Sequence, residues 1–287
     1  MKENITLFAE PIFHYQSFSI TNALLTSWLV VAIIVVLSLI LRSKLRLIPG
    51  KLQNVFEMIV DGALGLCDQV TNNRALSRKI FPIAISVFFF ILINNWLGIL
   101  PLGGFGIVEK SLPAVAGGQG LTFVPFLRSG TADINTTLAL AVMAVLGANI
   151  FGIFSVGLWK TFNKYVNLKV LGGIFTKIRH EPTIVIVAPI TFFVGLIEIV
   201  GEFAKVASLS FRLFGNVFAG EVLLVSMAAL VAYIVPVPFL FLELLVGVIQ
   251  ALIFSILLVV YFTIGASDHD EPDEVKKSII INSNSPI

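Results

Sequence analysis

Long apolar runs alternate with short polar connectors along the whole of this chain. The runs lie at 23–41, 81–100, 136–158, 184–235 and 237–265. The first three have about the 20 residues that a helix needs to cross a hydrocarbon core about 30 Å thick. The pattern therefore predicts about five membrane-crossing helices.

The segment 51–70 follows a different pattern. Its apolar residues recur at spacings of three and four positions, from Leu52 to Cys67, and polar residues occupy the opposite face. Such a helix lies along a membrane surface or against a partner. Asp61 and Asp68 belong to the polar face, so we interpret them as solvated residues rather than as catalytic acids.

The run 184–235 is too long for one perpendicular span, because as one helix it would extend roughly 75–80 Å. No proline and no polar loop divides it after Thr191. We therefore predict one strongly tilted helix that turns back at Pro236–Pro238 into a second. The predicted fold class is an all-α polytopic membrane protein, with one transmembrane domain over 1–287, one surface amphipathic helix, and a hairpin of two long, tilted helices at its end. We expect the polar tail 267–287 to be unstructured.

Composition agrees with a membrane protein. Of 287 residues, 57% are hydrophobic and only 13% are charged, whereas water-soluble domains have about a quarter charged residues. Cys67 is the one cysteine, which excludes an internal disulfide. Residues 1–20 have no basic region typical of a cleavable signal peptide, so we interpret 23–41 as a retained span.

The distribution of basic residues predicts the orientation. The connector 42–79 contains seven Lys and Arg residues, the connector 159–181 contains five, and the loop 101–130 contains two. Because basic connectors stay in the cytoplasm, the first two are predicted to be cytoplasmic. The N-terminus would then lie outside, and five crossings would bring the C-terminus to the cytoplasm.

Polar residues inside the run 184–235 are the candidate functional residues. Each ionisable side chain at bilayer depth costs about 2.5–3.5 kcal/mol, so several in one run suggest a functional site. They are Glu198, Glu202, Lys205, Arg212, Asn216 and Glu221. At about 100° per residue, Glu198, Lys205, Ser208 and Asn216 fall within about 40° of Arg212, and Glu221 points about 180° away.

Arg212 is the charged residue of this run with no evident partner in its own segment. Its neighbours are apolar, and no acid of its own segment lies beside it, so its permanent charge requires a carboxylate from another helix or another chain. Lys205 is different, since pairing with Glu198, Glu202 or Ser208 as a purely structural contact is equally favoured. In the last run, Glu243 and Gln250 share one face about 10 Å apart. A turn at Pro236–Pro238 places Gln250, rather than Glu243, closer to the level of Glu221.

Four segments resemble subunit a of F-type ATP synthases, in the order of that family. They are IPGKLQNVFEMIVDG (48–62), TADINTTLALA (131–141), SLSFRLFGNVFAGE (208–221) and IQALIFSILLVVYF (249–262). The resemblance implies a non-catalytic, ion-translocating subunit in a bacterial plasma membrane, without a cofactor, a metal ion or nucleic acid. The implied partners are a ring of small hairpin subunits that each bear a membrane carboxylate, the peripheral stalk subunits, and the lipid bilayer.

The resemblance also implies roles for individual residues. Arg212 would face the ring and block direct proton leak between two offset half-channels. The outer half-channel would contain Asn216, Glu221, Glu243 and Gln250, with Asp133 and Asn135 near its mouth. The inner half-channel would contain Glu198, Glu202 and Ser208.

Family members often carry His at one position of the Glu221 and Glu243 pair, whereas both are Glu here. Two adjacent carboxylates suit a shared-proton relay or a cation site, so sodium coupling stays an alternative. An ion-coupled secondary transporter is a second alternative, although we find no internal repeat of the kind that such proteins have. An intramembrane enzyme is disfavoured because His14, His180 and His269 all lie outside the spans.

Overall fold

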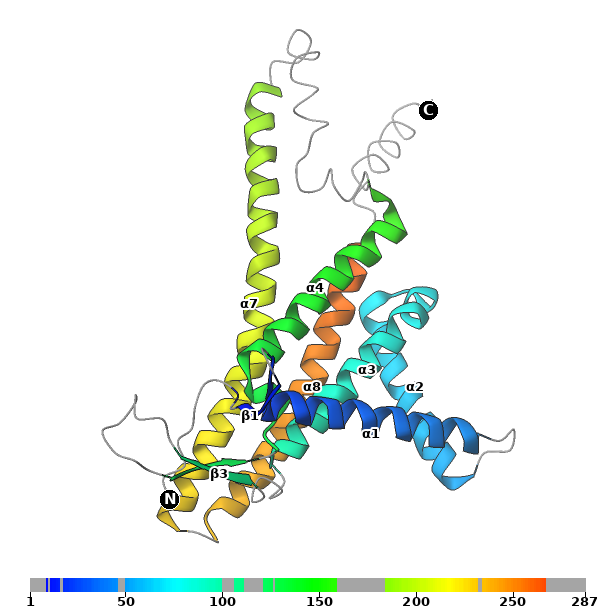
Figure 1. The fold of residues 1–287 in the computed structure, drawn as a ribbon. Helices are drawn as coiled ribbons and strands as arrows, with labels where there is room; N and C mark the ends of the chain where they lie inside the picture. Colours follow the sequence, from blue (N-terminus) through cyan, green and yellow to red (C-terminus); the bar gives the residue numbers. More distant parts are fainter. Residues whose placement is uncertain are drawn as a thin grey trace, which may run out of the picture. The chain divides into compact units, whose positions relative to one another are not determined.

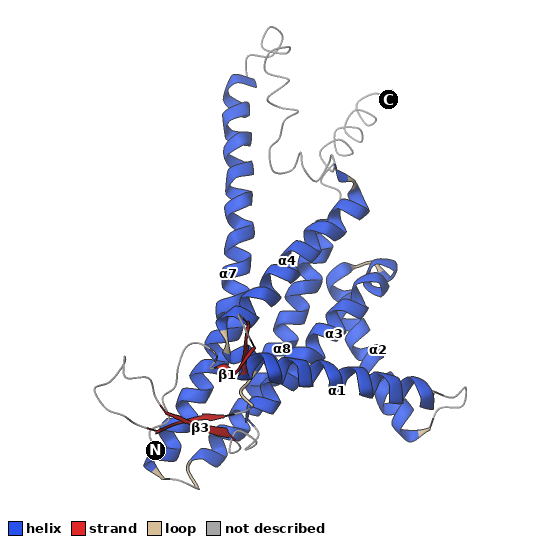
Figure 2. Ribbon diagram, viewed as in Figure 1, coloured by secondary structure: helices blue, strands red, loops and turns tan. Residues whose placement is uncertain are grey.

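Helices dominate the computed structural model of this chain (Figures 1 and 2). The structure describes residue 9 and the ranges 11–15, 18–45, 50–99, 106–110, 121–125, 127–158, 184–231 and 234–266. Within these residues the α-helices are α1 (Asn22–Lys44), α2 (Lys51–Thr71), α3 (Arg74–Ile99), α4 (Ile134–Val156), α7 (Ile184–Leu230) and α8 (Pro236–Ala266). The connector 159–181 and the tail 267–287 lie outside the described residues.

Two short antiparallel ribbons accompany the helices, and the sequence pattern did not predict either of them (Figure 2). Strand β1 (Pro11–Tyr15) pairs with β2 (Phe18–Thr21), and Tyr15 lies opposite Phe18. Strand β3 (Gly106–Lys110) pairs with β4 (Leu121–Pro125), and Lys110 lies opposite Leu121. Most of the other described residues are helical, and a short 3-10 helix η2 (Gly130–Ala132) precedes α4.

Five of the helices are long and apolar enough to cross a membrane, as the hydrophobic pattern predicted. Helix α1 shows why a bilayer is needed, because Val35, Val36, Leu37, Leu39 and Ile40 are all exposed. A contiguous apolar surface of this kind is rare on a water-soluble monomer and is normal where lipid replaces water. The protein is therefore a multi-pass membrane protein, with α2 as an amphipathic helix that does not span.

The turn between the last two helices differs from the prediction. Helix α7 ends at Leu230, several residues before the expected Pro236–Pro238 turn, and both prolines lie in the first turn of α8. Proline fits this position because the first N–H groups of a helix have no intrahelical partner. With 47 residues, α7 is about 70 Å long, so it is one continuous helix and not two spans.

The chain forms two compact units. The first comprises 1–144 and 204–259, and its core contains Val30, Ile80, Ile91, Leu213 and Phe254, all of them almost completely buried. The second comprises 145–203 and 260–287. There, Phe151 packs against Phe262 with 5.3 Å between ring centroids.

In the second unit, α4 and α8 approach each other through glycines. A Cβ atom on Gly152 would lie 2.6 Å from the Gly265 carbonyl oxygen, and one on Gly265 would lie 2.7 Å from the Ala148 carbonyl oxygen. Small residues allow membrane helices to bring their backbones into contact, which increases van der Waals packing where lipid gives no hydrophobic driving force.

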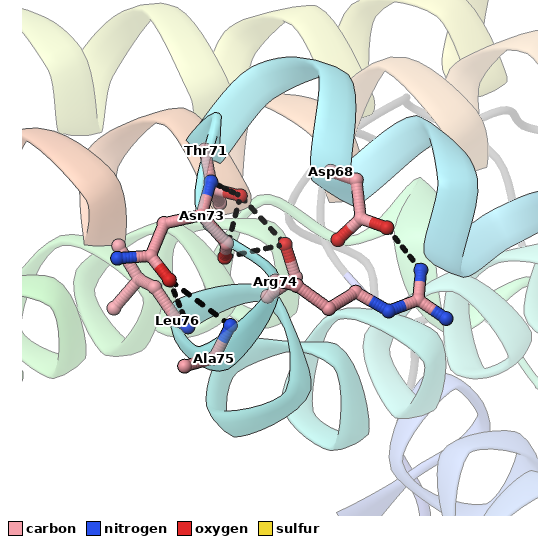
Figure 3. A network of polar contacts seen from close by, with 7 residues as sticks. Asp68, Thr71, Asn73, Arg74, Ala75 and Leu76 are labelled. Carbon is pink, nitrogen blue, oxygen red and sulfur yellow. Dashed lines mark hydrogen bonds and ion pairs between the residues drawn. The ribbon is translucent and has the colours of Figure 1, made fainter.

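The turn between α2 and α3 is closed by polar side chains (Figure 3). Asn72 ends α2 in the left-handed conformation, with φ of 49°. The Asn73 side-chain oxygen accepts hydrogen bonds from the backbone N–H groups of Ala75 and Leu76, at 3.0 and 3.3 Å, and so caps the start of α3. Arg74 forms an ion pair with Asp68 across this turn.

The carboxyl group of Asp68 has a pKa below its usual range, because the Ser77 hydroxyl and the Arg74 guanidinium both stabilise its charged form. The Arg74 guanidinium contributes more of this effect than Ser77 does, because the Ser77 hydroxyl bonds Thr71 and the Asn73 carbonyl, and Asp68 Oδ1 has no hydrogen-bond partner among the described atoms. The Asn73 cap explains why α3 begins at Arg74, before the apolar run at 81–100.

Acidification should loosen this turn. The pKa of Asp68 is lower in the folded state than the value of about 3.9 in the unfolded state. The ionised Asp68 therefore stabilises the turn fully at a pH above the unfolded pKa, and this stabilisation is lost as the pH falls through the folded pKa. Amide hydrogen exchange, corrected for intrinsic rates, should show residues 73–77 losing protection in that range. Asp68→Asn should already show the lower protection at pH 7 and should respond less to acid. Equal protection in the variant and the wild type at pH 7 would contradict this role.

Filling the glycine contact should destabilise the second unit. Gly152→Val should lower the free energy of unfolding by about 1–3 kcal/mol, because the added side chain meets backbone that cannot move aside. Thermal unfolding of the purified complex in detergent would measure the change. Gly62→Val is the matched control, since a Cβ atom there meets nothing within 4 Å. Equal unfolding temperatures for the two variants would show that the contact is not tight.

Candidate functional site

Arg212 lies on the exposed side of α7. Leu209, Ser210 and Leu213 are buried, whereas Phe211 and Arg212 are exposed. Within the described part of the chain, the Arg212 guanidinium makes no hydrogen bond and no ion pair. A permanently charged group on an apolar helix surface is thus available to a negative group from outside this chain.

The buried side of α7 is held against α4 by a polar contact. The Ser210 and Thr137 hydroxyl oxygens lie 3.3 Å apart, and both side chains are buried. This contact and the buried Leu213 fix the rotation of α7 about its axis, which directs Arg212 away from the packed side.

Asn216 lies one turn beyond Arg212 and pairs with α8. Its side-chain N–H donates to the Gln250 side-chain oxygen over 2.8 Å. Gln250 is buried and Asn216 is exposed, so the amide pair connects the interior of the first unit with the surface that carries Arg212. The structure therefore brings together two of the residues singled out from the sequence.

Glu221 is ion-paired with Arg128, a residue that the sequence interpretation counted among the loop charges but did not select. Arg128 Nε donates to Glu221 Oε1 at 3.0 Å, and Nη2 donates to Oε2 at 2.9 Å. The Arg128 side chain is 8% exposed and the Glu221 side chain 32%. The sequence does contain a feature that could have identified Arg128: it is the one arginine of a loop with few charges, and it precedes the TADINTT segment.

Glu243 reaches the same region from α8. Its carboxylate lies against the backbone of Gly220, where a Cβ atom on that glycine would collide with it. The prediction that Gln250 rather than Glu243 lies at the level of Glu221 was wrong. Because α7 ends at Leu230, Glu221 and Glu243 are similar distances from the two helix ends, and Gln250 instead meets Asn216.

Asp133 and Asn135 form the start of α4. The Asp133 carboxylate accepts from the Asn135 backbone and side-chain N–H groups, both at 3.3 Å, and from the Thr136 hydroxyl at 3.4 Å. Asp133 is buried and Asn135 is exposed. No hydrogen bond among the described residues joins this pair to Glu221 or Glu243, so its observed contacts are those of a helix cap.

Glu198 and Glu202 lie on the part of α7 that belongs to the second unit. Glu202 accepts a hydrogen bond of 3.4 Å from the Asn149 side chain on α4, a residue that sequence analysis did not select. Ser208 belongs to the first unit and is exposed. The three predicted inner residues are thus divided between the two units.

Cofactor or metal ligands do not gather in the described ranges. No three His, Cys, Asp or Glu side chains meet there in a way that could hold a metal ion. Glu221 is paired with the Arg128 guanidinium, and the Glu243 carboxylate lies against Gly220, the residue before Glu221. The arrangement is suited to proton exchange and to the recognition of a charged partner rather than to covalent catalysis.

Comparison with known proteins identifies the family of this chain. The family described as ATP synthase A chain matches residues 24–263. ATP synthase subunit a of Geotalea daltonii is 31% identical over 240 residues, covering 84% of this chain and 85% of that protein. The same subunit of Gloeobacter violaceus is 32% identical over 250 residues, covering 87% and 85%. That of Syntrophobacter fumaroxidans is 33% identical over 247 residues, covering 85% and 83%.

The match extends from α1 to the last turns of α8 and includes Arg128, Arg212, Glu221 and Glu243. It covers far more than half of the chain and relates it to proteins of similar length. The chain therefore belongs to the ATP synthase A chain family.

Proposed function

We propose that this protein is the stator proton-channel subunit of a rotary F-type ATP synthase, with Arg212 as the residue that separates two offset half-channels. The observation that carries this proposal is the position of Arg212, an exposed cation on a membrane helix with no partner among the described residues. Family membership supports the same function. It gives no support to the alternative of a secondary transporter.

The physics of the proposed gate follows from the charge of Arg212. A carboxylate of a passing ring subunit is attracted to the guanidinium and loses its proton as it approaches, so it cannot carry that proton past Arg212. Protons must then enter on one side of Arg212 and leave on the other, after the ring has turned. Each proton that crosses supplies about 2.3 kcal/mol per 100 mV of membrane potential.

The polar residues around Arg212 supply the two routes in this proposal. Asn216, Gln250, Glu221 and Glu243 serve the outer half-channel, and their contacts on α7 and α8 support this grouping. Asp133 and Asn135 lie near its mouth. Glu198, Glu202 and Ser208 serve the inner half-channel.

The proposed orientation has the N-terminus outside and the C-terminus in the cytoplasm of a bacterial cell, with the protein in the plasma membrane. The basic residues of α2 and of the start of α3 support it, since Lys51, Arg74, Arg78 and Lys79 would then face the cytoplasm. The proposed partners are a ring of hairpin subunits of about 80 residues, long enough for two spans, and the subunits of the peripheral stalk.

A sodium-coupled subunit is the second candidate, because Glu221 and Glu243 are adjacent carboxylates. A bound cation would need several of their oxygens as ligands. Arg128 engages both oxygens of Glu221 and adds a positive charge at that place, which disfavours a metal cation. Proton coupling is therefore the form of the function that the site supports best.

Removing the charge of Arg212 should abolish coupled transport. Arg212→Ala should reduce ATP-driven proton pumping to the background level while the complex still assembles, because nothing then separates the half-channels. Acidification of inverted membrane vesicles measures pumping, and co-purification of the other subunits measures assembly. Arg42→Ala, at an exposed arginine near the end of α1, is the matched control and should pump normally. Coupled pumping by an assembled Arg212→Ala complex would refute the assigned role.

The exposed side of α7 should contact the ring. In a Cys67→Ser background, Ser208→Cys should form a disulfide with a cysteine placed near the ring carboxylate, because Ser208 is exposed one turn from Arg212. Leu209→Cys should not, since that side chain is 2% exposed. Non-reducing electrophoresis after mild oxidation would detect the product. Cross-linking at Leu209 and not at Ser208 would mean that another side of the helix meets the ring.

A further inference from the structure

Close packing holds the backbone next to Arg128 in place. The segment that follows it packs closely against α1 and α3, as Gly98 and Gly130 show. A Cβ atom on Gly98 would collide with the Ser129 side chain, and one on Gly130 would collide with the Ser27 hydroxyl and lie 2.7 Å from Asn94 Oδ1. Such contacts leave the backbone next to Arg128 little room to shift.

Hydrogen bonds fix the same segment. The Ser129 hydroxyl donates to the Asn94 carbonyl at 3.2 Å, and the Thr131 hydroxyl donates to Asn95 Oδ1 at 2.6 Å. Asn95 in turn donates to the Gly247 carbonyl of α8 at 3.4 Å. The support of Arg128 is thereby linked to the helix that carries Glu243.

Glu221 and the neighbouring Glu243 are not equivalent. Glu221 receives the guanidinium through both of its oxygens, a paired geometry that orients the carboxylate as well as neutralising it. Glu243 Oε2 is buried and has no hydrogen-bond partner among the described residues. An ionised carboxylate in that position would lack compensation, and a proton provides it most simply.

We propose that Arg128 is a positioning residue of the outer half-channel, which keeps Glu221 as a fixed carboxylate and leaves Glu243 as the carboxyl group that exchanges the translocated proton. A hydronium ion in the outer aqueous route gives its proton to the ionised Glu243 carboxylate, which forms an O–H bond there and leaves water. This O–H bond breaks when the proton is transferred to an ionised ring carboxylate, and Glu243 returns to its charged form. Glu221 stays paired with Arg128 throughout. Arg128 has this role only if the protein is the proton-channel subunit proposed above.

Single substitutions of Arg128 test the positioning role in the complete ATP synthase complex. Arg128→Gln should lower ATP-driven proton pumping about tenfold or more, because it leaves Glu221 as an unpaired carboxylate beside Glu243. Arg128→Lys should retain clearly more activity, since it keeps the charge. Arg74→Gln removes an arginine from the more exposed ion pair with Asp68 and is the matched control, with near-normal pumping expected. Equal pumping by Arg128→Gln and the wild type would overturn the proposal.

Two double variants identify the exchanging acid. Arg128→Gln/Glu221→Gln removes both members of the ion pair and should pump several-fold better than Arg128→Gln alone, because the net charge around Glu243 is restored. Arg128→Gln/Glu243→Gln makes the same number of changes and should not recover. The opposite pattern would make Glu221 the exchanging acid and would overturn the assignment.

Assembly and the basic function are measured in parallel. If Arg128→Gln prevents assembly, the exchanged pair Arg128→Glu/Glu221→Arg decides: restored assembly and pumping support the ion pair, and continued loss overturns it. The wild type and Arg212→Ala are included in every series. A wild type that does not pump, or an Arg212→Ala complex that does, would refute the proposed function itself. If the wild type pumps, Arg212→Ala does not, and the two double variants behave alike, only the role of Arg128 is refuted and the proposed function stands.

Discussion

A charged group within a hydrocarbon layer must be compensated, and this constraint organises the polar residues of the molecule. Most of the polar side chains on α7 have a partner in the described structure: Asn216 pairs with Gln250, Glu221 with Arg128, and Glu202 with Asn149. Arg212 has none there and is exposed. Such a cation is available to the counter-charge from another protein that the proposed function requires.

The compensated residues depend on a tightly packed support. In the first unit, η2 and the residues before it approach α1 and α3 so closely that Gly98 and Gly130 could not carry side chains without displacement. Ser129, Thr131 and Asn95 bond across the same place. Polar networks of this kind are costly when incomplete and stabilise one geometry when complete, which suits a site where small displacements would alter proton exchange.

The helices that carry the site differ from those that meet the lipid. Helix α1 exposes a long apolar surface, whereas α7 and α8 combine apolar residues with amides and acids at matching levels. Helix α2 has a third pattern and is joined to α3 by the Asn73 cap and the Asp68–Arg74 ion pair, which the polar surroundings of a membrane surface tolerate.

The sequence alone determined the fold class, the number of spanning helices, the amphipathic helix and the family resemblance. Each follows from local hydrophobic periodicity or from a contiguous motif, so no tertiary information was needed. It also showed that Arg212 has apolar neighbours, because the residues that flank it are visible in the chain itself. The two ribbons were missed, since their strands are short and lie in stretches without strong alternation.

Only the tertiary structure decided which polar residues meet. The end of α7 at Leu230 sets the level of every residue on α7 relative to α8. The sequence pattern predicted this end a few residues too late, and so it placed Gln250 instead of Glu243 at the level of Glu221. Arg128 and Glu221 lie 93 positions apart, so no local pattern could pair them. Contacts between distant segments depend on how whole helices pack, whereas hydrophobicity along the chain fixes only which helices exist.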